Sequence, residues 1–430
     1  MPRIVSTNCN FEREPLISPF GFKGGYLSEL WQSVALVESD SGHRGIGLGT
    51  QSVLWSDGGV FTSNSESAGN SLMYMLTAHA LKTARGLSFA SPIHLLDELL
   101  PITYEYGKRV TGSDDLRLTF ALNALVAVDN AAWLLHCAEA GIGTLDEMIP
   151  EDARPALSHR HSELGCIPLM TYGVLVEDIV RAVDEGCFLL KIKIGSDPDR
   201  DGDLEKMLAW DKQRLTSIHQ ALKERETPCT DSGRVLYYLD ANGRYDGIDR
   251  LMRFLDHAEE IGALDRIILL EEPFPEEMKL DVSGIPVRLA ADESAHSDAD
   301  AVERIDMGYG AIALKPIAKT MSMSLRIARI AHERGVPCFC ADLTVNPILV
   351  DWNKSVAARL APLPGVKIGV LESNGPQNYR SWEVMKSYHP HAGAPWIDAA
   401  DGIFRLDSSF YAQSGGVFAE SDHYRALVSK

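Results

Sequence analysis

The chain has 430 residues, more than one compact core usually holds, so we expect one large domain with a smaller companion. Hydrophobic residues make up 45% and charged residues 23%, which is typical of a globular protein and excludes a disordered one. The formal net charge of -19 argues against nucleic acid and anionic membranes as partners, because both require clustered cations. A small anionic substrate stays compatible with this charge, since a metal ion and a few lysines reverse the potential inside a pocket.

The N-terminal segment and the cysteines indicate the compartment. Residues 1–10 lack the apolar core of a signal peptide, and the chain contains no apolar run of about eighteen residues. The seven cysteines are odd in number and show no CxxC spacing, so they read as reduced thiols. The sequence therefore predicts a cytoplasmic protein, and a homo-oligomer is compatible with it.

Residues 1–155 combine strand and helix patterns. Residues 30–38 are rich in strand formers, residues 40–43 supply a turn, and a second strand follows. Its glycines at 45, 47 and 49 alternate every second residue and open no helix, so a nucleotide-binding loop is not expected. Residues 66–90 and 115–140 carry helical periodicity. We predict an α+β domain over 1–155.

After Pro155, short apolar strands alternate with amphipathic helical stretches. The predicted strands are residues 166–172, 188–194, 235–241, 266–270, 287–291, 311–314, 337–341 and 366–371. Strands joined by helices pair in parallel, and eight such strands close a barrel. We therefore predict an α/β fold: a TIM-type (β/α)7β barrel over 160–384, preceded by the α+β domain. The last segment, 385–430, is expected to pack back on the first domain.

Two lysines share one face of the second predicted strand. In residues 188–194, alternation separates Lys191 and Lys193 from the apolar side chains of Leu190 and Ile192. If the apolar face meets the helices, both ammonium groups point into the barrel near the rim where barrel enzymes keep their active sites. The alternative is an edge strand that lysines protect from aggregation.

Acidic residues end the next three strands, and a lysine ends the sixth. Asp240, Glu271, Asp292 and Lys315 follow one another at 31, 21 and 23 positions, each about one βα unit. Three uncompensated carboxylates at one rim would raise one another's pKa. A hard divalent cation removes this repulsion, and ligands that are all oxygen favour Mg²⁺ or Mn²⁺. The alternative role of such acids, helix N-capping, explains one of them better than three in series.

These motifs resemble the enolase superfamily, which includes mandelate racemase, and specifically its muconate-lactonizing-enzyme-like branch with a lysine pair. The matching pieces are Lys191-Ile-Lys193, Asp240-Ala-Asn242, Glu271-Glu-Pro273, Ala291-Asp-Glu-Ser294 and Leu314-Lys315, in that family's order. Residues 127–133, 21–25 and 49–57 are similar to that family's capping domain. The resemblance implies a barrel with a capping domain at its mouth.

The resemblance also implies roles for single residues. It implies Asp240, Glu271 and Asp292 as Mg²⁺ ligands, with Lys193 and Lys315 as acid/base groups on opposite faces of a carboxylate substrate. It implies that Lys191 helps to hold the substrate carboxylate and that its charge favours the neutral form of Lys193. Asn242 is expected to contact the substrate, and Lys23 and Trp55 lie in the loops that cover the mouth in this family.

Two strand ends depart from the family's patterns. The seventh strand ends without the histidine of mandelate-racemase-like members, and the eighth ends Leu371-Glu372-Ser-Asn374 instead of the Asp-x-Asp of dipeptide epimerases. Glu372 and Asn374 are therefore candidate substrate contacts with a loose match. The stretch of 47 residues from Lys193 to Asp240 is long and receives no role from the sequence.

The chemistry implied is abstraction of the α-proton of a small-molecule carboxylate through a stabilised enolate. Our first prediction is an isomerase, by racemisation, epimerisation or cycloisomerisation. The nearest alternative is a lyase, either a sugar-acid dehydratase or an enzyme of the succinylbenzoate-synthase type. An imine-forming aldolase using Lys193 or Lys315 leaves the three acids unexplained. A non-catalytic carboxylate-binding protein is the fourth hypothesis.

Overall fold

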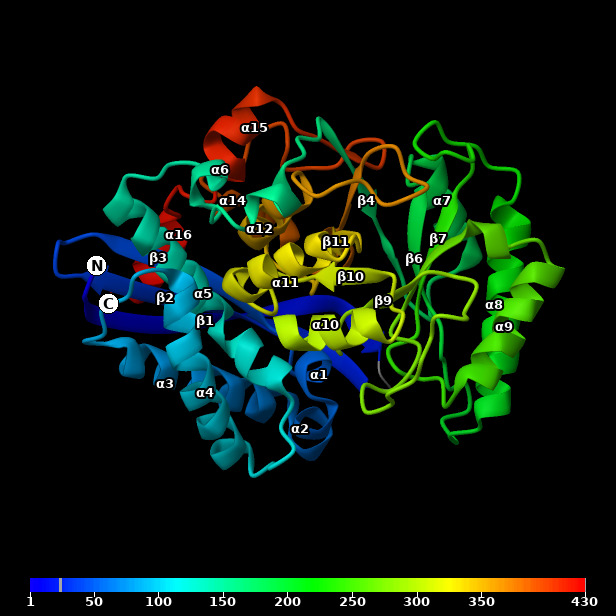
Figure 1. Cartoon of the computed structure of the whole chain (residues 1–430), viewed down its shortest axis with the longest axis horizontal. Helices are drawn as coiled ribbons and strands as arrows, with labels where there is room; N and C mark the ends of the chain where they lie inside the picture. Colours follow the sequence, from blue (N-terminus) through cyan, green and yellow to red (C-terminus); the bar gives the residue numbers. More distant parts are fainter. Residues whose placement is uncertain (23–24, 430) are drawn as a thin grey trace.

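The computed structural model describes residues 1–22 and 25–429, so Lys23, which the sequence predicts at the mouth, lies outside the described residues. A three-stranded antiparallel sheet with its helices forms one part of the molecule, and a barrel forms the other (Figure 1). We call the first part the cap and define it as the elements from β1 to α6. The described chain therefore has the two-part architecture that the sequence predicts.

The cap sheet has the order β1-β2-β3, in which each strand is antiparallel to its neighbour. Its strands are β1 (Ile4–Phe22), β2 (Gly25–Ser39) and β3 (Arg44–Gln51). Its helices are α1 (Val53–Ser56), α2 (Gly58–Ser63), α3 (Glu66–Ala84), α4 (Pro92–Thr111), α5 (Leu118–Ala140) and α6 (Leu145–Met148). The predicted hairpin and the two predicted helices are present, whereas β1 and α4 are elements that the sequence pattern did not reveal.

The glycines of β3 let α5 lie directly on the sheet. A Cβ atom added to Gly45 would lie 2.0 Å from the carbonyl oxygen of Ala131, and one added to Gly47 would lie 2.1 Å from that of Ala127. Both obstacles are backbone atoms of α5, which cannot move aside as a flexible side chain could. The alternating glycines therefore serve helix packing, and the expectation that they form no nucleotide loop agrees with this contact.

Most residues of helix α5 are buried. It is long and apolar enough to cross a membrane by composition, but 89% of its apolar window is buried inside the protein. Its Asp129 reaches the barrel, where Oδ2 accepts from the backbone N–H of Ser322 (3.0 Å) and Oδ1 accepts from the Ser322 hydroxyl (2.5 Å). The apolar character of α5 thus reflects its position between the cap sheet and the barrel.

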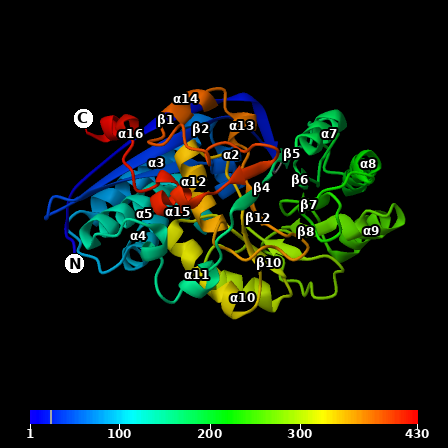
Figure 2. The same ribbon diagram turned by 90° about the horizontal axis from the view of Figure 1, so that it is seen from above.

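One barrel strand, interrupted by a single proline, joins the two ends of the sheet and so closes the barrel. The sheet has the order β13-β4-β12-β11-β10-β9-β8-β7-β6-β5, and only Pro168 separates β4 from β5. β4 pairs in parallel with β12, and β5 pairs in parallel with β6, so β4 and β5 act as one strand that joins both ends of the sheet. The eight resulting strands form the predicted TIM-type barrel (Figure 2).

The strand bounds follow the predicted ones within a few residues. The strands are β4 (Glu163–Ile167), β5 (Leu169–Met170), β6 (Leu189–Lys193), β7 (Leu236–Asp240), β8 (Ile267–Glu271), β9 (Leu289–Ala291), β10 (Ala311–Leu314), β11 (Cys338–Cys340), β12 (Gly369–Glu372) and β13 (Ile403–Arg405). The helices are α7 (Val176–Asp184), α8 (Leu204–Leu222), α9 (Ile248–Glu260), α10 (Asp298–Asp306), α11 (Met321–Glu333), α12 (Pro347–Ala357), α13 (Gly375–Asn378), α14 (Trp382–Ser387), α15 (Ser408–Gln413) and α16 (Asp422–Val428). Short 3₁₀ turns occur at η1 (Arg154–Leu157), η2 (Leu264–Arg266) and η3 (Ser414–Gly416).

One connection differs from the expected alternation. Residues 272–288 between β8 and β9 are all described and contain no helix. Prolines at 273, 275 and 286 explain this difference, because a proline inside a helix removes a hydrogen bond and clashes with the preceding turn. The expectation of a helical stretch after every strand is wrong at this position.

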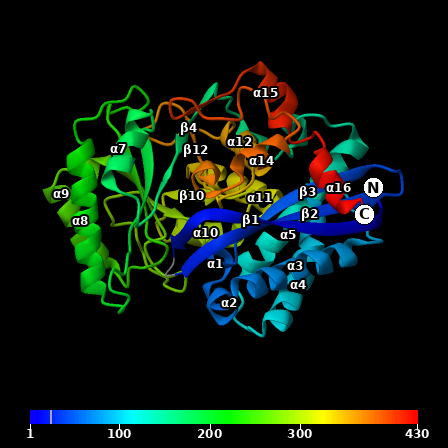
Figure 3. The ribbon, with the colours of Figure 1, turned by 180° about the vertical axis from the view of Figure 1, so that it is seen from behind.

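The C-terminal segment touches both parts of the molecule. β13 pairs antiparallel with β4 of the barrel. α16 lies against β1, where the side-chain amides of Asn8 and Asn10 donate to the carbonyls of Val428 (2.8 Å) and Leu427 (2.9 Å) (Figure 3). The domain boundaries given for 1–155, 160–384 and 385–430 stay predictions.

Candidate active site

A small cavity of about 40 Å³ lies at the carboxyl ends of the barrel strands. Barrel side chains form its floor, and Phe20, Leu27, Leu30 and Trp55 of the cap line its other side. The predicted residues that line it are Trp55, Lys191, Lys193, Asp240, Asn242, Glu271, Lys315, Glu372 and Asn374. Asp292 joins this set through its contacts with Lys315 and Trp55, so the described candidates converge on one place.

Both lysines of β6 point into the barrel. β6 lies between β5 and β7, which rules out the edge-strand alternative, and Lys191 and Lys193 are only 3% and 5% exposed. The Lys191 ammonium lies 3.0 Å from Asp240 Oδ2, 3.0 Å from Glu271 Oε2 and 3.1 Å from Glu372 Oε2. Lys193 donates to Asp240 Oδ2 (2.6 Å) and to Asn242 Oδ1 (2.5 Å).

These contacts settle the charge of Lys191. Burial alone would lower its pKa, but Asp240, Glu271 and Glu372 outweigh burial and hold the pKa well above its usual value. Burial likewise favours the neutral form of Asp240, yet the two lysines lower the pKa of that carboxyl to about 2. These contacts therefore favour the charged form of Lys191 beside Lys193 and Asp240.

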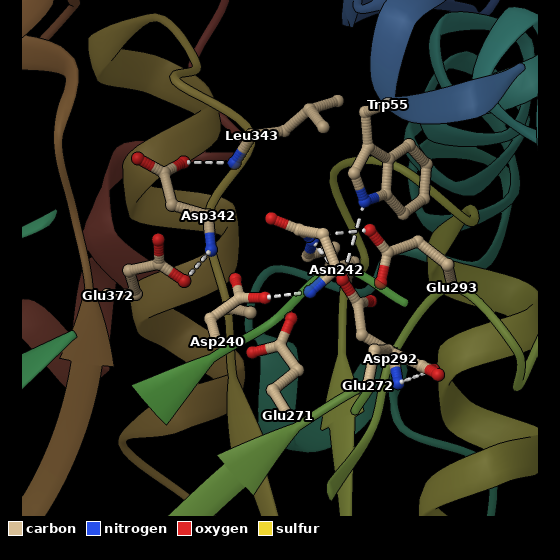
Figure 4. Close-up of polar contacts among 12 residues, drawn as sticks. Trp55, Asp240, Asn242, Glu271, Glu272, Asp292, Glu293, Asp342, Leu343 and Glu372 are labelled. Atoms are coloured by element: carbon tan, nitrogen blue, oxygen red, sulfur yellow. Dashed lines mark hydrogen bonds and ion pairs between the residues drawn. The ribbon is translucent and has the colours of Figure 1, made fainter. Parts of the chain in front are cut away.

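Lys315 directly follows β10 and reaches the cavity, where its side chain contacts Asp292. Its ammonium donates to Asp292 Oδ2 (2.5 Å) and lies 4.6 Å from the ring centre of Trp55. The indole N–H of Trp55 donates to the same oxygen at 3.3 Å (Figure 4). Burial would lower the pKa of Lys315, but the charge of Asp292 raises it above its usual value.

Lys319 contacts Asp292 but was not among the residues predicted from the sequence. Its side chain is fully buried, and its ammonium lies 3.2 Å from Asp292 Oδ1 while it also donates to the carbonyls of Asp292 and Ala295. The signal was its spacing of four residues after Lys315, immediately before a helix. Asp292 therefore carries two lysines, one on each oxygen.

Glu272 fixes the backbone on which Asp292 sits. Its Oε1 accepts from the backbone N–H of Asp292 (2.6 Å), and from the N–H (2.9 Å) and hydroxyl (2.6 Å) of Ser294. Burial raises the pKa of Glu272 to about 7, with Glu293 adding to the shift. Glu272 has a positive φ of 39°, a backbone conformation that is uncommon for residues with a side chain. This role was invisible in the sequence, where Glu272 is only the second acid of a pair.

The acids form a donor set that fits a hard divalent cation. Glu271, Asp292 and Glu293 each offer one carboxylate oxygen, and these atoms lie within 4.8 Å of one another. Burial raises the pKa of Glu271 to about 8, and the charge of Asp292 adds to the shift although Lys191 opposes it. Oxygen ligands of this kind suit Mg²⁺ or Mn²⁺.

This set differs in one member from the predicted ligands. Glu293, which the sequence reading passed over, belongs to the cluster and accepts from the Asn242 amide (3.0 Å). Asp240 instead turns Oδ2 toward Lys191 and Lys193, and its Oδ1 accepts from the backbone N–H of Asn242 at 3.1 Å (Figure 4). The ligand role of Asp240 stays a prediction.

The ends of β11 and β12 form a connected acidic corner. Glu372 Oε2 accepts from the Asp342 N–H (3.0 Å) in addition to Lys191, and its Oε1 accepts from the Asn374 amide (3.2 Å). Asp342, which was not among the predicted site residues, accepts from the backbone N–H groups of Leu343 (2.7 Å) and Asn374 (2.8 Å). Burial, and then the charge of Glu372, raises the pKa of Asp342 to about 7. These side chains line the cavity, and hydrogen bonds to other groups of the protein hold them in place.

Comparison with known proteins supports a family and a fold. Residues 174–366 match the model of the family described as enolase C-terminal domain-like. No curated protein matches the chain.

Several solved structures share the fold. An N-succinyl Arg/Lys racemase from Bacillus cereus ATCC 14579 is 15% identical with a TM-score of 0.66, over 100% of this chain and 98% of the other. A dipeptide epimerase from Enterococcus faecalis V583, in complex with Mg and L-Leu-L-Tyr, is 17% identical with a TM-score of 0.63, over 94% and 97%. The L-Ala-D/L-Glu epimerase from Bacillus subtilis is 18% identical with a TM-score of 0.63, over 88% and 91%.

Proposed function

We propose that the chain, whose residues 174–366 match the enolase C-terminal domain-like family, is an enolase-superfamily enzyme: a metal-dependent isomerase that moves the α-proton of a small carboxylic acid. The proposal includes racemisation, epimerisation and cycloisomerisation, which share this first step. A small-molecule carboxylate is its partner, in the cytoplasm, without nucleic acid or membrane. Assembly into a homo-oligomer stays a prediction.

One observation carries the proposal. Lys193 and Lys315 stand at the ends of β6 and β10, which are four strands apart in an eight-stranded ring and therefore on opposite sides of it. Both ammonium groups line the same cavity. A planar carboxylate substrate held between them presents one face of its α-carbon to each lysine, as an exchange between two mirror-related configurations requires.

The surrounding charges suit an enolate intermediate. The α-proton of a carboxylate is too weakly acidic for an amine base unless the developing negative charge is stabilised. Lys191 offers a positive charge at the cavity wall. Glu271, Asp292 and Glu293, with Asp240 as the further predicted ligand, would hold Mg²⁺ or Mn²⁺, which supplies charge stabilisation as a Lewis acid when bound.

The remaining residues shape the substrate site. Asn242, Glu372 and Asn374 line the cavity from the strand ends, and Trp55 covers Lys315 from the cap. The burial of these groups keeps water away from the two lysines, which strengthens every electrostatic interaction in the cavity. We assign substrate contacts to these four residues.

The proposal is tested by proton exchange in heavy water. The panel should contain dipeptides and N-succinylamino acids, on which the similar proteins act by name, together with sugar acids as dehydratase substrates. With Mg²⁺ present, NMR should show exchange of the α-proton in both enantiomers of an accepted acid. Lys193→Ala should lose exchange for one enantiomer by about a hundredfold or more, and Lys315→Ala for the other. Lys206→Ala, at the exposed start of α8, is the matched control.

Other outcomes point to other functions. Loss of exchange for the same enantiomer in both lysine variants, with release of water from the acid, indicates the lyase. Trapping of the protein by borohydride and substrate indicates an imine-forming aldolase. Binding of acids without exchange or turnover indicates the carboxylate-binding protein. Full exchange in both lysine variants would remove the lysines from the mechanism.

A further inference from the structure

The long stretch between Lys193 and Asp240 contains a buried carboxylate that the proposed mechanism does not use. Asp211 lies in α8 and its side chain is fully buried. It is not among the residues that line the cavity. A carboxylate is costly to bury, so its position requires partners that satisfy it.

Those partners belong to the turns that follow two neighbouring barrel strands. The backbone N–H of Gly195, two residues after Lys193, donates to both oxygens of Asp211 at 2.9 Å. The hydroxyl of Tyr245, three residues after Asn242, donates to Oδ2 at 2.8 Å. One side chain of α8 therefore joins the turn after β6 to the turn after β7.

Further contacts hold the same turn from its other side. The Arg244 guanidinium donates to the carbonyl of Gly195 (3.2 Å), and the Tyr172 hydroxyl donates to the carbonyl of Ile194 (3.1 Å). Gly195 has a φ of +81°, which a residue with a side chain rarely adopts. The turn after β6 is thus fixed at consecutive peptide groups, and Asp211 satisfies its central N–H.

We propose that Asp211 is a positioning residue for Lys193: by tying the turn after β6 to the turn after β7, it sets the Lys193 ammonium against Asp240 and Asn242. This inference rests on the proposed function. Lys193 itself is held by the oxygens of Asp240 and Asn242, which stand on β7 and at its end, so a shift between these two strand ends would misplace the base. A misplacement of about 1 Å typically costs about a hundredfold in rate.

The proposed positioning by Asp211 affects Lys193 and not Lys315. Lys315 directly follows β10, across the ring, and the contacts of Asp211 described above reach the turns after β6 and β7. Loss of Asp211 should therefore slow the half-reaction of Lys193 more than that of Lys315. A purely structural role would slow both alike, because general loosening does not distinguish the two sides of the barrel.

The test compares the two half-reactions in Asp211→Ala, with Asp211→Asn as the conservative variant. The probe is the acid of the panel that exchanges fastest, and Lys193→Ala identifies the enantiomer that depends on Lys193. In Asp211→Ala, exchange of that enantiomer should fall at least tenfold more than exchange of the other, and Asp211→Asn should recover part of the difference. Asp146→Asn, which removes a carboxylate bonded to Arg359 away from these turns, should slow both equally.

Amide hydrogen exchange provides a readout that needs no substrate. Peptides that cover residues 194–196 should lose protection at least tenfold in Asp211→Ala, whereas peptides that cover 315–320 should not change. Tyr245→Phe, which removes one hydroxyl, should show the same pattern more weakly and serves if Asp211→Ala does not fold. Unchanged protection at 194–196, or an equal fall in exchange of both enantiomers, would overturn the inference. Absence of proton exchange in the wild type would instead reject the proposed function.

Discussion

The contact between Asp129 and Ser322 makes a quantitative prediction about pH. Asp129 lies in α5, and burial raises its pKa to about 6, although hydrogen bonds from Ser322 partly oppose the shift. A rise in the pKa from the usual aspartate value of 3.8 to about 6 corresponds to about 3 kcal/mol. The substitution Asp129→Asn removes this titration and keeps the shape of the side chain.

The sign of the pH dependence follows from the number of protons that the folded and unfolded states bind at Asp129. Between about pH 4 and pH 6, the unfolded chain is ionised at this position while the folded protein keeps its proton, so the free energy of unfolding falls as pH rises. Above about pH 6 the folded protein carries the full penalty. The stability of Asp129→Asn relative to the wild type should therefore rise by about 2 kcal/mol from pH 4 to pH 7. The lost second hydrogen bond from Ser322 adds an offset that does not depend on pH.

The assay is urea unfolding followed by circular dichroism at several pH values in this range. Asp114→Asn, at an exposed position between α4 and α5, controls for the removal of one negative charge. A stability difference between wild type and Asp129→Asn that stays constant across the range would refute the buried, protonated Asp129.

Three further predictions concern the metal, the cap and the packing of α5. Mg²⁺ at a hundredfold excess over its Kd should add about 2.7 kcal/mol, a rise in Tm of about 3 °C, and Asp292→Asn should abolish this rise in calorimetry without unfolding the barrel. Trp55→Phe keeps a ring over Lys315 but removes the N–H to Asp292, so kcat/KM should change about tenfold more for some acids than for others; an equal loss for all acids with a lower Tm would mean a structural role. Gly47→Ala should cost about 3 kcal/mol or more in urea unfolding because its Cβ meets the backbone of α5, whereas Gly143→Ala, with open space around it, should be neutral.

The barrel could be predicted because its strands are short apolar runs that end in polar residues, and their bounds agree within a few residues. β1 was missed because polar and charged residues interrupt it and Pro15 lies within it, so its pattern does not alternate cleanly. α4 was missed although Pro92 starts it and Lys108 and Arg109 end it, because Pro101 lies in its interior. Both elements are stabilised by tertiary contacts that local patterns do not carry.

The residues of the site also divide into those that could be predicted from the sequence and those that could not. Lys191, Lys193, Asp240, Glu271 and Lys315 could be found because strand alternation and βα spacing place them at one rim. Lys319 could not, because it lies beside a helix and contacts partners distant in the chain. The same holds for Asp211 and Asp129, which lie outside the cavity. Glu293 shows an intermediate case: it directly follows Asp292, so its type was visible, but its direction depends on the turn after β9.

The position of α5 also has a consequence during synthesis on the ribosome. Ser322, the barrel partner of Asp129, is made 193 residues after it, which takes about 10 to 40 s at the usual rate of translation. Throughout that time, α5, whose apolar length is sufficient for a membrane span, lacks this barrel partner. Nascent chains that stop before α11 should therefore aggregate or remain bound to chaperones, whereas chains that extend past α11 should be released.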